Sequence, residues 1–506
     1  MAGKQYRAWT SLDESFLFPP SPRDWLPKDH LVYFILDVVE VLDLSAIEDV
    51  LQAKDPRGER PYNPAMMVAL LVYSYCLGVF SSRKIAAATY EQVAFRVLTG
   101  EQHPHFTRIA AFRKAHLAAF SALFKQVLLL CRQAGLVKLG QVAVDGSKIQ
   151  ANASKHKAMS YAYMQELERR LESEISSLLS QATAADTAED EQFGEGEEPQ
   201  DIPAELKRRT DRLAKLRVAK EALEAEAREA RAQHLRELAA GCDERAATDE
   251  ENRSLNETLA QKHRAQADEL SARGDDDADA PPFQTPDGLP KHRPNTTIDG
   301  APDPKAQRNF TDPESRIMES GGAFGQDYNC QAAVDDAAQI VVAASVTNQS
   351  PDAGNLIPMV RLIVENCGRA PTATTADTGY WTPLVAPECA ALGTTAYVAT
   401  ERRKHWYKDQ SNTSGAPPEG ADPKTLMRHQ VRTAAGRAIY ALRKSTVEPV
   451  FGQIKEVRGF RRFSMRGLYA AQHEWLLVCA THNLLKLFRV GNARRSNPRQ
   501  RGLAAA

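Results

Sequence analysis

The chain has 506 residues, of which 43% are apolar, and a formal net charge of −1, so it can bury a sizeable core and is expected to hold about two to four domains. Its seven cysteines are scattered without a CxxC pair, which argues against a zinc site and a disulfide framework and favours a reducing cytoplasm. No signal-peptide pattern opens the chain, and the best membrane candidate, 65–80, has only 16 residues, so we expect a buried helix there.

The balanced charge hides an uneven distribution. From Gly436 onward, 14 Lys and Arg face 3 Glu, whereas 185–201 and 272–281 are strongly acidic. A basic segment in a near-neutral protein indicates a polyanion partner for that segment. A solvated tail explains 491–506, but 440–467 interleaves apolar residues with its charges and fits that explanation less well.

Residues 1–138 are predicted to form an all-helical N-terminal domain. Helix start signals stand at Asn63–Pro64, Ser82 and Thr107, and Gly135 is a stop signal. Basic residues near the helix starts suit a helix-turn-helix DNA-binding domain; they are Arg83, Lys84, Arg108, Arg113 and Lys114. An ordinary helical bundle would show much the same pattern, so both interpretations stay open on these residues.

Residues 139–158 change to a strand pattern, in which "QVAVDGSKIQA" is a β-run interrupted by Asp-Gly. This predicts Asp145 at or near a turn. Residues 159–272 repeat apolar side chains at three-to-four spacing, which predicts two helices folded back through the acidic loop 184–201 as an inserted antiparallel coiled coil. Residues 273–325 are rich in Asp, Pro and Gly and are predicted to be a linker or extended loop.

Residues 326–490 return to strand and helix patterns, and 491–506 form the basic tail. The expected elements are a hairpin of strands 327–335 and 339–347, a helix at 353–368, strands at 372–380 and 394–400, and helices at about 428–457 and 470–489.

Two acids stand at or near the end of an apolar strand, Asp145 in "VAVDGSK" and Asp377 in "TTADTGYW". A lone aspartate there is more often a turn residue or a helix cap. A helix carrying Glu448 and packed beside the sheet would bring a third carboxylate to them. Three carboxylates repel one another unless hard cations neutralise them, as Mg²⁺ does in sites of phosphoryl chemistry.

The basic neighbours of Glu448 strengthen this hypothesis. Lys444, Glu448 and Lys455 fall within about 40° of one another around a helix, which suits a metal-binding acid with phosphate-binding neighbours. The alternative is plain helix support between Lys444 and Glu448. It leaves the basic run "RGFRRFSMRG" directly after them unexplained.

These motifs resemble a known family. "VAVDGSK", "ADTGYW" and "YALRKSTVEPVFGQIK" are similar to the three acidic motifs of bacterial insertion-sequence transposases of the DDE class. The last is similar to their Tyr–Arg–Glu–Lys signature, here Tyr440, Arg443, Glu448 and Lys455. "PYNPAMM" and "NFTDPESRIMESGGAFGQDYNCQAAVD" resemble the branch whose catalytic domain is split by a helical insertion after the first Asp. The resemblance covers about 30–490.

One departure concerns the signature's basic residue. The family usually has three residues between Arg and Glu, whereas four separate Arg443 from Glu448. Lys444 has the commoner spacing, so the sequence leaves open which cation takes the arginine's place.

The resemblance implies an α/β fold with a ribonuclease H-like mixed sheet. It also implies two Mg²⁺ or Mn²⁺ ions held by Asp145, Asp377 and Glu448. Double-stranded DNA is the expected partner, and a homodimer is expected to bind it. No membrane partner is expected, and the expected location is the bacterial cytoplasm, at the nucleoid. The DNA-binding candidates are Tyr440, Arg443, Lys444, Lys455, Arg458, Arg461 and Arg462.

Three functions remain in competition. The first is a transposase that cuts at element ends and joins them to target DNA. The second is a nuclease of the same fold that hydrolyses DNA without strand transfer. The third is an inactive DNA-binding repressor derived from a transposase, which the presence of all three acids argues against. A strand-transfer assay with Mg²⁺ or Mn²⁺ separates the first two.

Overall fold

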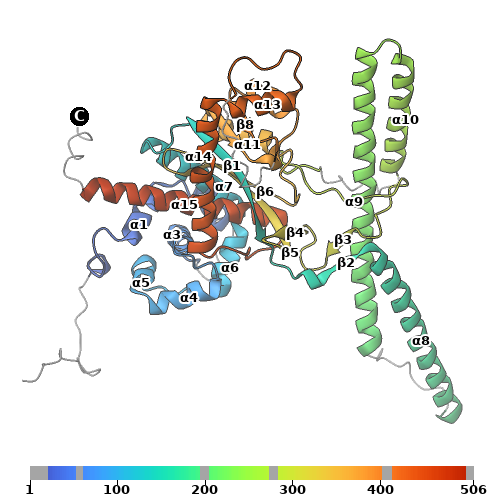
Figure 1. Ribbon diagram of the computed structural model, residues 1–506. Helices are drawn as coiled ribbons and strands as arrows, with labels where there is room; N and C mark the ends of the chain where they lie inside the picture. Colours follow the sequence, from blue (N-terminus) through green and yellow to red (C-terminus); the bar gives the residue numbers. More distant parts are fainter. Residues whose placement is uncertain (1–20, 53–60, 194–203, 273–282, 402–412, 497–506) are drawn as a thin grey trace, which may run out of the picture. The chain divides into compact units, whose positions relative to one another are not determined.

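The computed structural model describes residues 21–52, 61–193, 204–272, 283–401 and 413–496 (Figure 1). These residues fall into two compact units. The first comprises the N-terminal part through Leu136, Val457–Gly459 and the chain from Leu477 onward; the second comprises Val137–Glu456 and Phe460–Leu476. Part of the predicted acidic loop, 194–201, and most of the predicted basic tail, 497–506, lie outside the described residues.

The regular elements of the first unit are all helices, and besides the N-terminal part predicted to be helical the unit includes Val457–Gly459 and the C-terminal part of α15 (Leu468–Ser496). Its helices from the N-terminal part are α1 (Leu31–Val41), α2 (Ser45–Gln52), α3 (Pro64–Cys76), α4 (Ser82–Glu91), α5 (Val93–Thr99), α6 (Phe106–Ala115) and α7 (Leu117–Gln133). Helix α3 begins where the sequence predicts, because Asn63 Oδ1 accepts from the Met66 N–H at 3.2 Å and Pro64 needs no partner for a missing N–H. Every residue from Met67 to Cys76 is buried, so the prediction of a buried helix is confirmed.

Two helix boundaries in this unit differ from the predictions. Helix α4 follows Ser81 rather than Ser82, and α6 starts after His105, whose Nδ1 accepts from the Thr107 N–H, so Thr107 is not the cap. Within the described ranges, no single helix is long and apolar enough to cross a membrane; the pair α6 and α7, bent by 75°, passes only on length and composition.

Arg113 does not belong to a DNA-reading surface. Its side chain is buried, and its guanidinium donates to Tyr75 Oη at 2.9 Å and to the Phe80 carbonyl at 3.0 Å. A buried guanidinium with these partners stabilises the helical packing. Arg83, Arg108 and Lys114 are exposed.

A six-stranded mixed sheet forms the centre of the second unit. Its strands are β1 (Gln141–Gln150), β4 (Arg316–Ser320), β5 (Ala323–Asp335), β6 (Ile340–Thr347), β7 (Ala373–Ala376) and β8 (Thr395–Val398). The order is β4-β5-β1-β7-β8, with β6 also paired to β5. Strand β5 runs antiparallel to both β1 and β6, whereas β7 runs parallel to β1 and β8 parallel to β7. The predicted hairpin of β5 and β6 is confirmed.

Residues 283–325, the described part of the predicted linker 273–325, contain two strands. Strand β4 lies at the edge of the sheet beside β5, and β3 (Gln307–Asn309) pairs with β2 (Ala158–Ser160) in a two-stranded ribbon. The sequence concealed β4 because Arg316 and Glu319 interrupt its apolar alternation.

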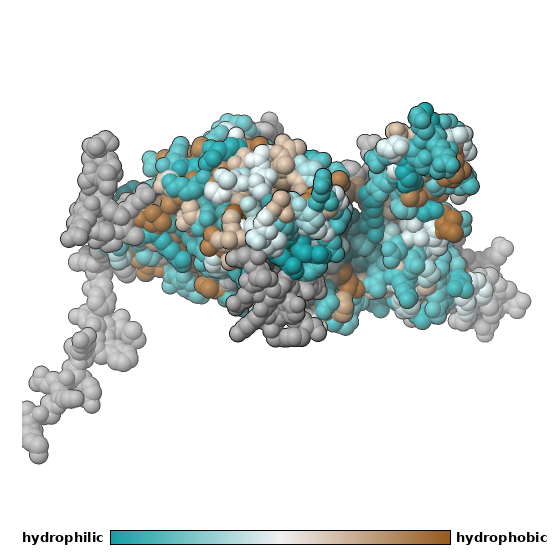
Figure 2. All heavy atoms as spheres, turned by 45° about the horizontal axis from the view of Figure 1, so that its top comes forward, coloured by the Kyte–Doolittle hydropathy of each residue, from teal (hydrophilic) through white to brown (hydrophobic). Residues whose placement is uncertain are grey.

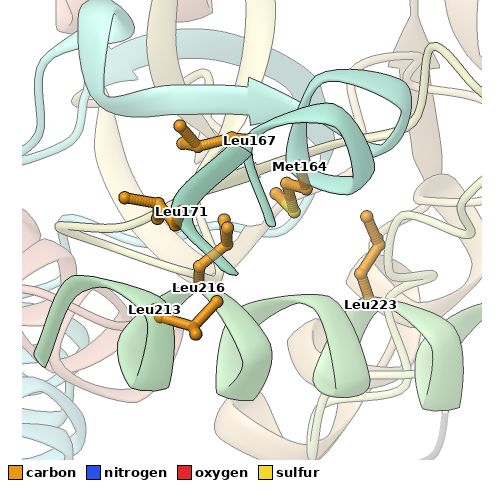
Figure 3. Packing of buried hydrophobic residues seen from close by; sticks show 6 residues of the cluster. All are labelled: Met164, Leu167, Leu171, Leu213, Leu216 and Leu223. Carbon is orange, nitrogen blue, oxygen red and sulfur yellow. The ribbon is translucent and has the colours of Figure 1, made fainter. Parts of the chain in front are cut away.

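The inserted segment contains three helices, one more than predicted: α8 (Tyr161–Phe193), α9 (Ala204–Thr248) and α10 (Arg253–Ala272). Helix α8 also continues through Phe193, into the segment predicted as an acidic loop. Figure 3 shows how α8 and α9 pack through the apolar positions that the sequence pattern singled out; they are Met164, Leu167, Leu171, Leu213, Leu216 and Leu223. The face of α8–α10 in Figure 2 is mostly hydrophilic, with a few separate hydrophobic side chains.

The helices that follow the β5–β6 hairpin include α14, which carries Glu448 of the third acidic motif. They are α11 (Leu356–Cys367), α12 (Val385–Ala391), α13 (Pro423–Arg432), α14 (Ala434–Gly452), a π-helical turn Gln453–Val457 and α15 (Leu468–Ser496). The single helix predicted at 428–457 is broken at Thr433, which is extended and whose Oγ1 accepts from the Gly436 N–H at 3.0 Å. This cap starts α14, which packs against β1 of the sheet.

Candidate active site

Asp145 lies on β1, and Asp377 directly follows the neighbouring parallel strand β7. The register pairs Ala143 of β1 with Thr375 of β7, and each aspartate stands two residues further along its strand direction. The two aspartates therefore hold equivalent positions in the register of two adjacent strands, which lie about 4.8 Å apart. Burial raises the pKa of Asp145 to about 6, Arg443 opposes that shift, and the charge of Asp377 adds to it.

The local conformations of the two aspartates differ. Asp377 follows the end of β7, and its Oδ1 caps the next turn by accepting from the Gly379 N–H at 2.8 Å. Asp145 lies inside β1, which continues to Gln150. The predicted turn at Asp145–Gly146 is therefore wrong. A turn conformation does not explain the glycine at position 146.

Arg443 joins Asp145 to Glu448. Its Nη1 lies 3.1 Å from Asp145 Oδ2, and its Nη2 lies 3.7 Å from Glu448 Oε1. The side chains of Asp145 and Arg443 are 20% and 10% exposed, whereas that of Glu448 is 52% exposed. Since both carboxylates contact one planar guanidinium, these oxygens lie less than about 10 Å apart.

The geometry also distinguishes Arg443 from Lys444. Arg443 points to the acids, whereas Lys444 is exposed on α14. Tyr440 lies one turn earlier on the same helix and interacts with Arg443, and burial raises the pKa of its hydroxyl. Arg443 therefore occupies the basic position beside the acids, despite its extra residue of spacing from Glu448.

Lys455 contacts the strand that carries Asp145. Its Nζ donates to Ser147 Oγ at 3.0 Å and lies 3.4 Å from the Lys148 carbonyl. It belongs to the π-helical turn that follows α14, a geometry often found at functional sites. The idealised helix angle between Glu448 and Lys455 thus does not apply, although Lys455 still contacts β1.

The remaining basic candidates separate into exposed and buried side chains. Arg461 and Arg462 are exposed, next to the end of β1, where the Phe463 N–H donates to the Gln150 carbonyl at 2.8 Å. Arg458 is buried in the helical unit, and its guanidinium donates to Thr481 Oγ1 at 2.8 Å. A side chain used in this way cannot reach DNA, so the prediction for Arg458 is wrong.

The acids at this site are of the ligand type that divalent cations take, but they are not gathered into a metal site. Across the described residues, no three His, Cys, Asp or Glu side chains are gathered tightly enough to hold a metal ion as they stand. The Arg443 guanidinium lies between Asp145 and Glu448 and provides the positive charge there. The raised pKa of Asp145, to about 6, reflects burial and neighbouring carboxylates that this one cation does not fully offset. Carboxylate oxygens whose negative charge is only partly offset are the ligands that Mg²⁺ and Mn²⁺ prefer.

One acid at this site escaped the sequence reasoning. Asp352, in the loop between β6 and α11, contributes to raising the pKa of both Asp145 and the buried Tyr380 hydroxyl. Its Oδ2 lies 3.7 Å from the point where a Cβ on Gly379 would stand, and Asp377 Oδ1 lies 3.1 Å from that point. The only sequence signal was an acid in a polar loop that follows a strand.

Family comparison connects this site to a known class of protein. Residues 20–115 match the Transposase domain (DUF772), and residues 403–488 match the Transposase DDE domain. Comparison with curated proteins and with solved structures gives no significant match. The chain belongs to the DDE transposases of insertion sequences. The transposase acts on DNA, and its family implies dependence on a divalent metal. Arg443, Glu448 and Lys455 lie within the matched DDE domain.

Proposed function

We propose that the transposase cleaves DNA at the ends of its insertion sequence and transfers the strands to target DNA, with Asp145, Asp377 and Glu448 as metal ligands. The observation that carries the proposal is the shared contact of Arg443 with Asp145 and Glu448, which are remote in sequence, beside the strand that leads to Asp377. Only folding brings these acids together, and a structural role explains one such acid more easily than three.

A ribonuclease H-like sheet is part of this proposal. Three antiparallel strands, β1, β5 and β6, are followed by two strands parallel to β1, and α14 packs against β1. That order supports the assignment. The insertion α8–α10 enters after β2 and leaves the sheet continuous, and we propose that α8 and α9 form the antiparallel coiled coil.

Two ions, Mg²⁺ or Mn²⁺, would bind to Asp145, Asp377 and Glu448. When bound, they supply Lewis-acid activation of water or a 3′-hydroxyl and stabilise the leaving oxygen. The chain's own residues prepare the site: Arg443 partly offsets the charge of Asp145 and Glu448 beforehand, and Ser147 accepts from the Lys455 ammonium beside the same strand. Arg443 can then donate to a phosphate oxygen of the DNA.

Exposed basic side chains of the same unit would hold the DNA backbone. Arg462 Nη2 donates to Asn152 Oδ1 at 3.2 Å, and Arg466 Nε donates to the Asn152 carbonyl at 3.1 Å, so two arginines are anchored at the end of β1. With them we assign DNA contacts to Tyr440, Lys444, Lys455 and Arg461. Phosphate contacts of this kind provide affinity and position without reading sequence.

Selective recognition of the element ends is assigned to the helical N-terminal region. Its matched transposase domain and the exposed Arg83, Arg108 and Lys114 support a helix-turn-helix type of reader. We further propose that a homodimer pairs two element ends, and that the protein works in the bacterial cytoplasm on nucleoid DNA. All seven cysteines are buried thiols, which agrees with a reducing compartment.

A strand-transfer assay tests the proposal. The substrate is a labelled duplex that carries an end of the element, found as an inverted repeat beside the gene, together with a target plasmid and Mg²⁺ or Mn²⁺. Wild type should join the labelled end to the plasmid, and Asp377→Asn should bind the end without cutting it. Hydrolysis without joining would identify a nuclease, and binding without cleavage by wild type would identify a repressor.

A further inference from the structure

We propose that Asp352 is a positioning residue of the catalytic site, which fixes the Lys148 ammonium and the spacing of the backbone segments that carry Asp145 and Asp377. The inference rests on the proposed function, because it concerns the same carboxylate site. Asp352 belongs to the loop between β6 and α11, whereas the acids it supports come from β1 and from the end of β7.

The Asp352 carboxylate is held from three directions. Its Oδ1 accepts from Asn329 Nδ2 at 2.7 Å and from Gln331 Nε2 at 2.9 Å, both on β5. Lys148 Nζ of β1 lies 3.4 Å from Oδ1 and 3.5 Å from Oδ2. The Lys148 and Asp352 side chains are only 15% and 21% exposed, so the ion pair is largely shielded from water. A shielded charge pair with additional amide donors is geometrically well defined.

Two glycines leave room for this carboxylate. A Cβ on Gly146 would stand 2.7 Å from Asp352 Oδ1 and 2.4 Å from Gln331 Nε2. A Cβ on Gly379 would stand 3.6 Å from the Asp352 Cβ and 3.7 Å from its Oδ2. These glycines come one residue after Asp145 and two residues after Asp377. Asp352 therefore lies between the backbones that carry the two aspartates, close enough to set the distance between them.

The amide partner of Asp352 is itself fixed. Gln331 Oε1 accepts from the hydroxyl of the fully buried Tyr380, three residues after Asp377, and the Gln331 carbonyl accepts from Trp475 Nε1 at 2.9 Å. The chain of contacts thus runs from β1 through Asp352 and Gln331 to the turn that begins at Asp377. A displacement of Asp352 would therefore shift both Asp145 and Asp377 through this chain of contacts.

The same contacts assign Asp352 a positioning role and not that of a metal ligand. Its Oδ1 accepts from two amides, and the Lys148 ammonium lies within 3.5 Å of both carboxylate oxygens, which reduces its capacity to coordinate a cation. Partners that orient metal ligands typically change metal affinity or activity by about 10–100-fold when they are removed.

The test compares Mn²⁺ affinity, measured by calorimetry on the full-length protein well below its melting temperature, among matched variants. Asp352→Asn keeps the shape and removes the charge, and we expect it to weaken Mn²⁺ binding about 10-fold. Lys148→Gln removes the ion pair from the other side, and it keeps the test possible if Asp352→Asn does not fold. The control is Asp336→Asn, an exposed aspartate in the β5–β6 turn, which should bind as wild type does.

A double variant separates positioning from simple destabilisation. If Asp352 acts through Lys148, the combined effect of Asp352→Asn and Lys148→Gln on Mn²⁺ affinity should be smaller than the product of the single effects. Wild-type Mn²⁺ affinity in a folded Asp352→Asn protein, or in Lys148→Gln where only that variant folds, would overturn the inference. Complete loss of binding in Asp352→Asn, equal to the loss in Asp377→Asn, would make it a ligand and also overturn the inference. Wild-type binding by Asp377→Asn would overturn the proposed site itself, which is a distinguishable failure.

Discussion

Arg443 donates to the carboxylate of Asp145 across 3.1 Å, from a helix that begins almost 300 residues after the strand it contacts. The contact anchors α14 to the centre of the sheet and brings Glu448 to the same place. It also explains how a buried aspartate and its acidic neighbours can coexist before a metal ion binds.

Replacement of Arg443 should increase the electrostatic repulsion among the carboxylates of the site. Arg443→Gln leaves Asp145 buried without its partner, so we expect a loss of about 3 kcal/mol in the free energy of unfolding without metal. Saturating Mn²⁺ should restore much of that loss, because the added cation provides the missing charge. Thermal unfolding with and without Mn²⁺ measures both effects. Lys444→Gln, an exposed neighbour on the same helix, is the control and should change neither value. If Mn²⁺ stabilises wild type and Arg443→Gln equally, the guanidinium does not substitute for a cation.

The pKa of Asp145 predicts how metal binding depends on pH. Burial raises it from the ordinary value of 3.8 to about 6, so the folded protein binds a proton there more tightly than the unfolded chain. The stabilisation from this proton is complete below about pH 4 and is lost as the pH rises through about 6. Protons and metal compete for the same carboxylate, so the Mn²⁺-induced rise in melting temperature should shrink as the pH falls from 7 to 5. Titrating that rise in wild type checks the prediction, and a constant rise over this range would contradict it.

Gly146 provides a test of packing inside β1. A methyl group there would stand within 2.9 Å of three polar atoms, from Gln331, Asp352 and Asn329. We expect Gly146→Ala to destabilise the protein by about 1–3 kcal/mol, the usual effect of overpacking. Chemical denaturation measures the change. The control is Gly140→Ala, just before the strand, where the added methyl group meets no atom within 4 Å. Equal stability of the two variants would show that the loop with Asp352 yields easily.

The same glycine shows where sequence reasoning ended. Short apolar runs predicted strand β1 and the hairpin of β5 and β6, because strands buried on both faces give such runs. Asp-Gly inside an apolar run then indicated a turn, since glycine is commonest there. Here the glycine makes room for a loop that is 206 residues away in sequence, and local sequence contains no record of such a neighbour.

Some site residues could be predicted from local motifs, whereas others could not. Asp145, Asp377 and Glu448 could be proposed because each lies in a recognisable motif. Asp352 could not, because a polar loop acquires its position only from the strands it joins. Arg458 was misplaced for the opposite reason: a basic run predicts a charged surface, but the fold buries one member of the run against α15 in the helical unit.

The interface between α8 and α9 should depend on its buried leucines. Leu216 is 1% exposed within the cluster of Figure 3, so Leu216→Ala should cost about 2–5 kcal/mol of local stability. Amide hydrogen exchange in α8 should become faster, while exchange in the sheet strands stays unchanged. Val218→Ala, on the same helix at a position 66% exposed, is the matched control. Unchanged exchange in α8 after Leu216→Ala would show that the helix is stable without this interface.

Arg462 and Arg458 allow the electrostatics of DNA binding to be separated from folding. Arg462 is exposed beside Asn152, and its replacement by Gln should reduce the slope of log affinity against log salt by about 1, the effect of one lost phosphate contact. The melting temperature should stay as in wild type, because an exposed arginine with one side-chain partner contributes little stability.

Arg458→Gln should have the opposite effects on the melting temperature and the salt slope. Its guanidinium donates to the Val478 carbonyl and to Thr481 Oγ1 inside the helical unit, so its loss should lower the melting temperature and leave the salt slope of the folded fraction unchanged. Binding isotherms at several salt concentrations, with thermal unfolding of the same samples, measure both quantities. A reduced salt slope in Arg458→Gln, or an unchanged slope in Arg462→Gln, would contradict this assignment of the two arginines.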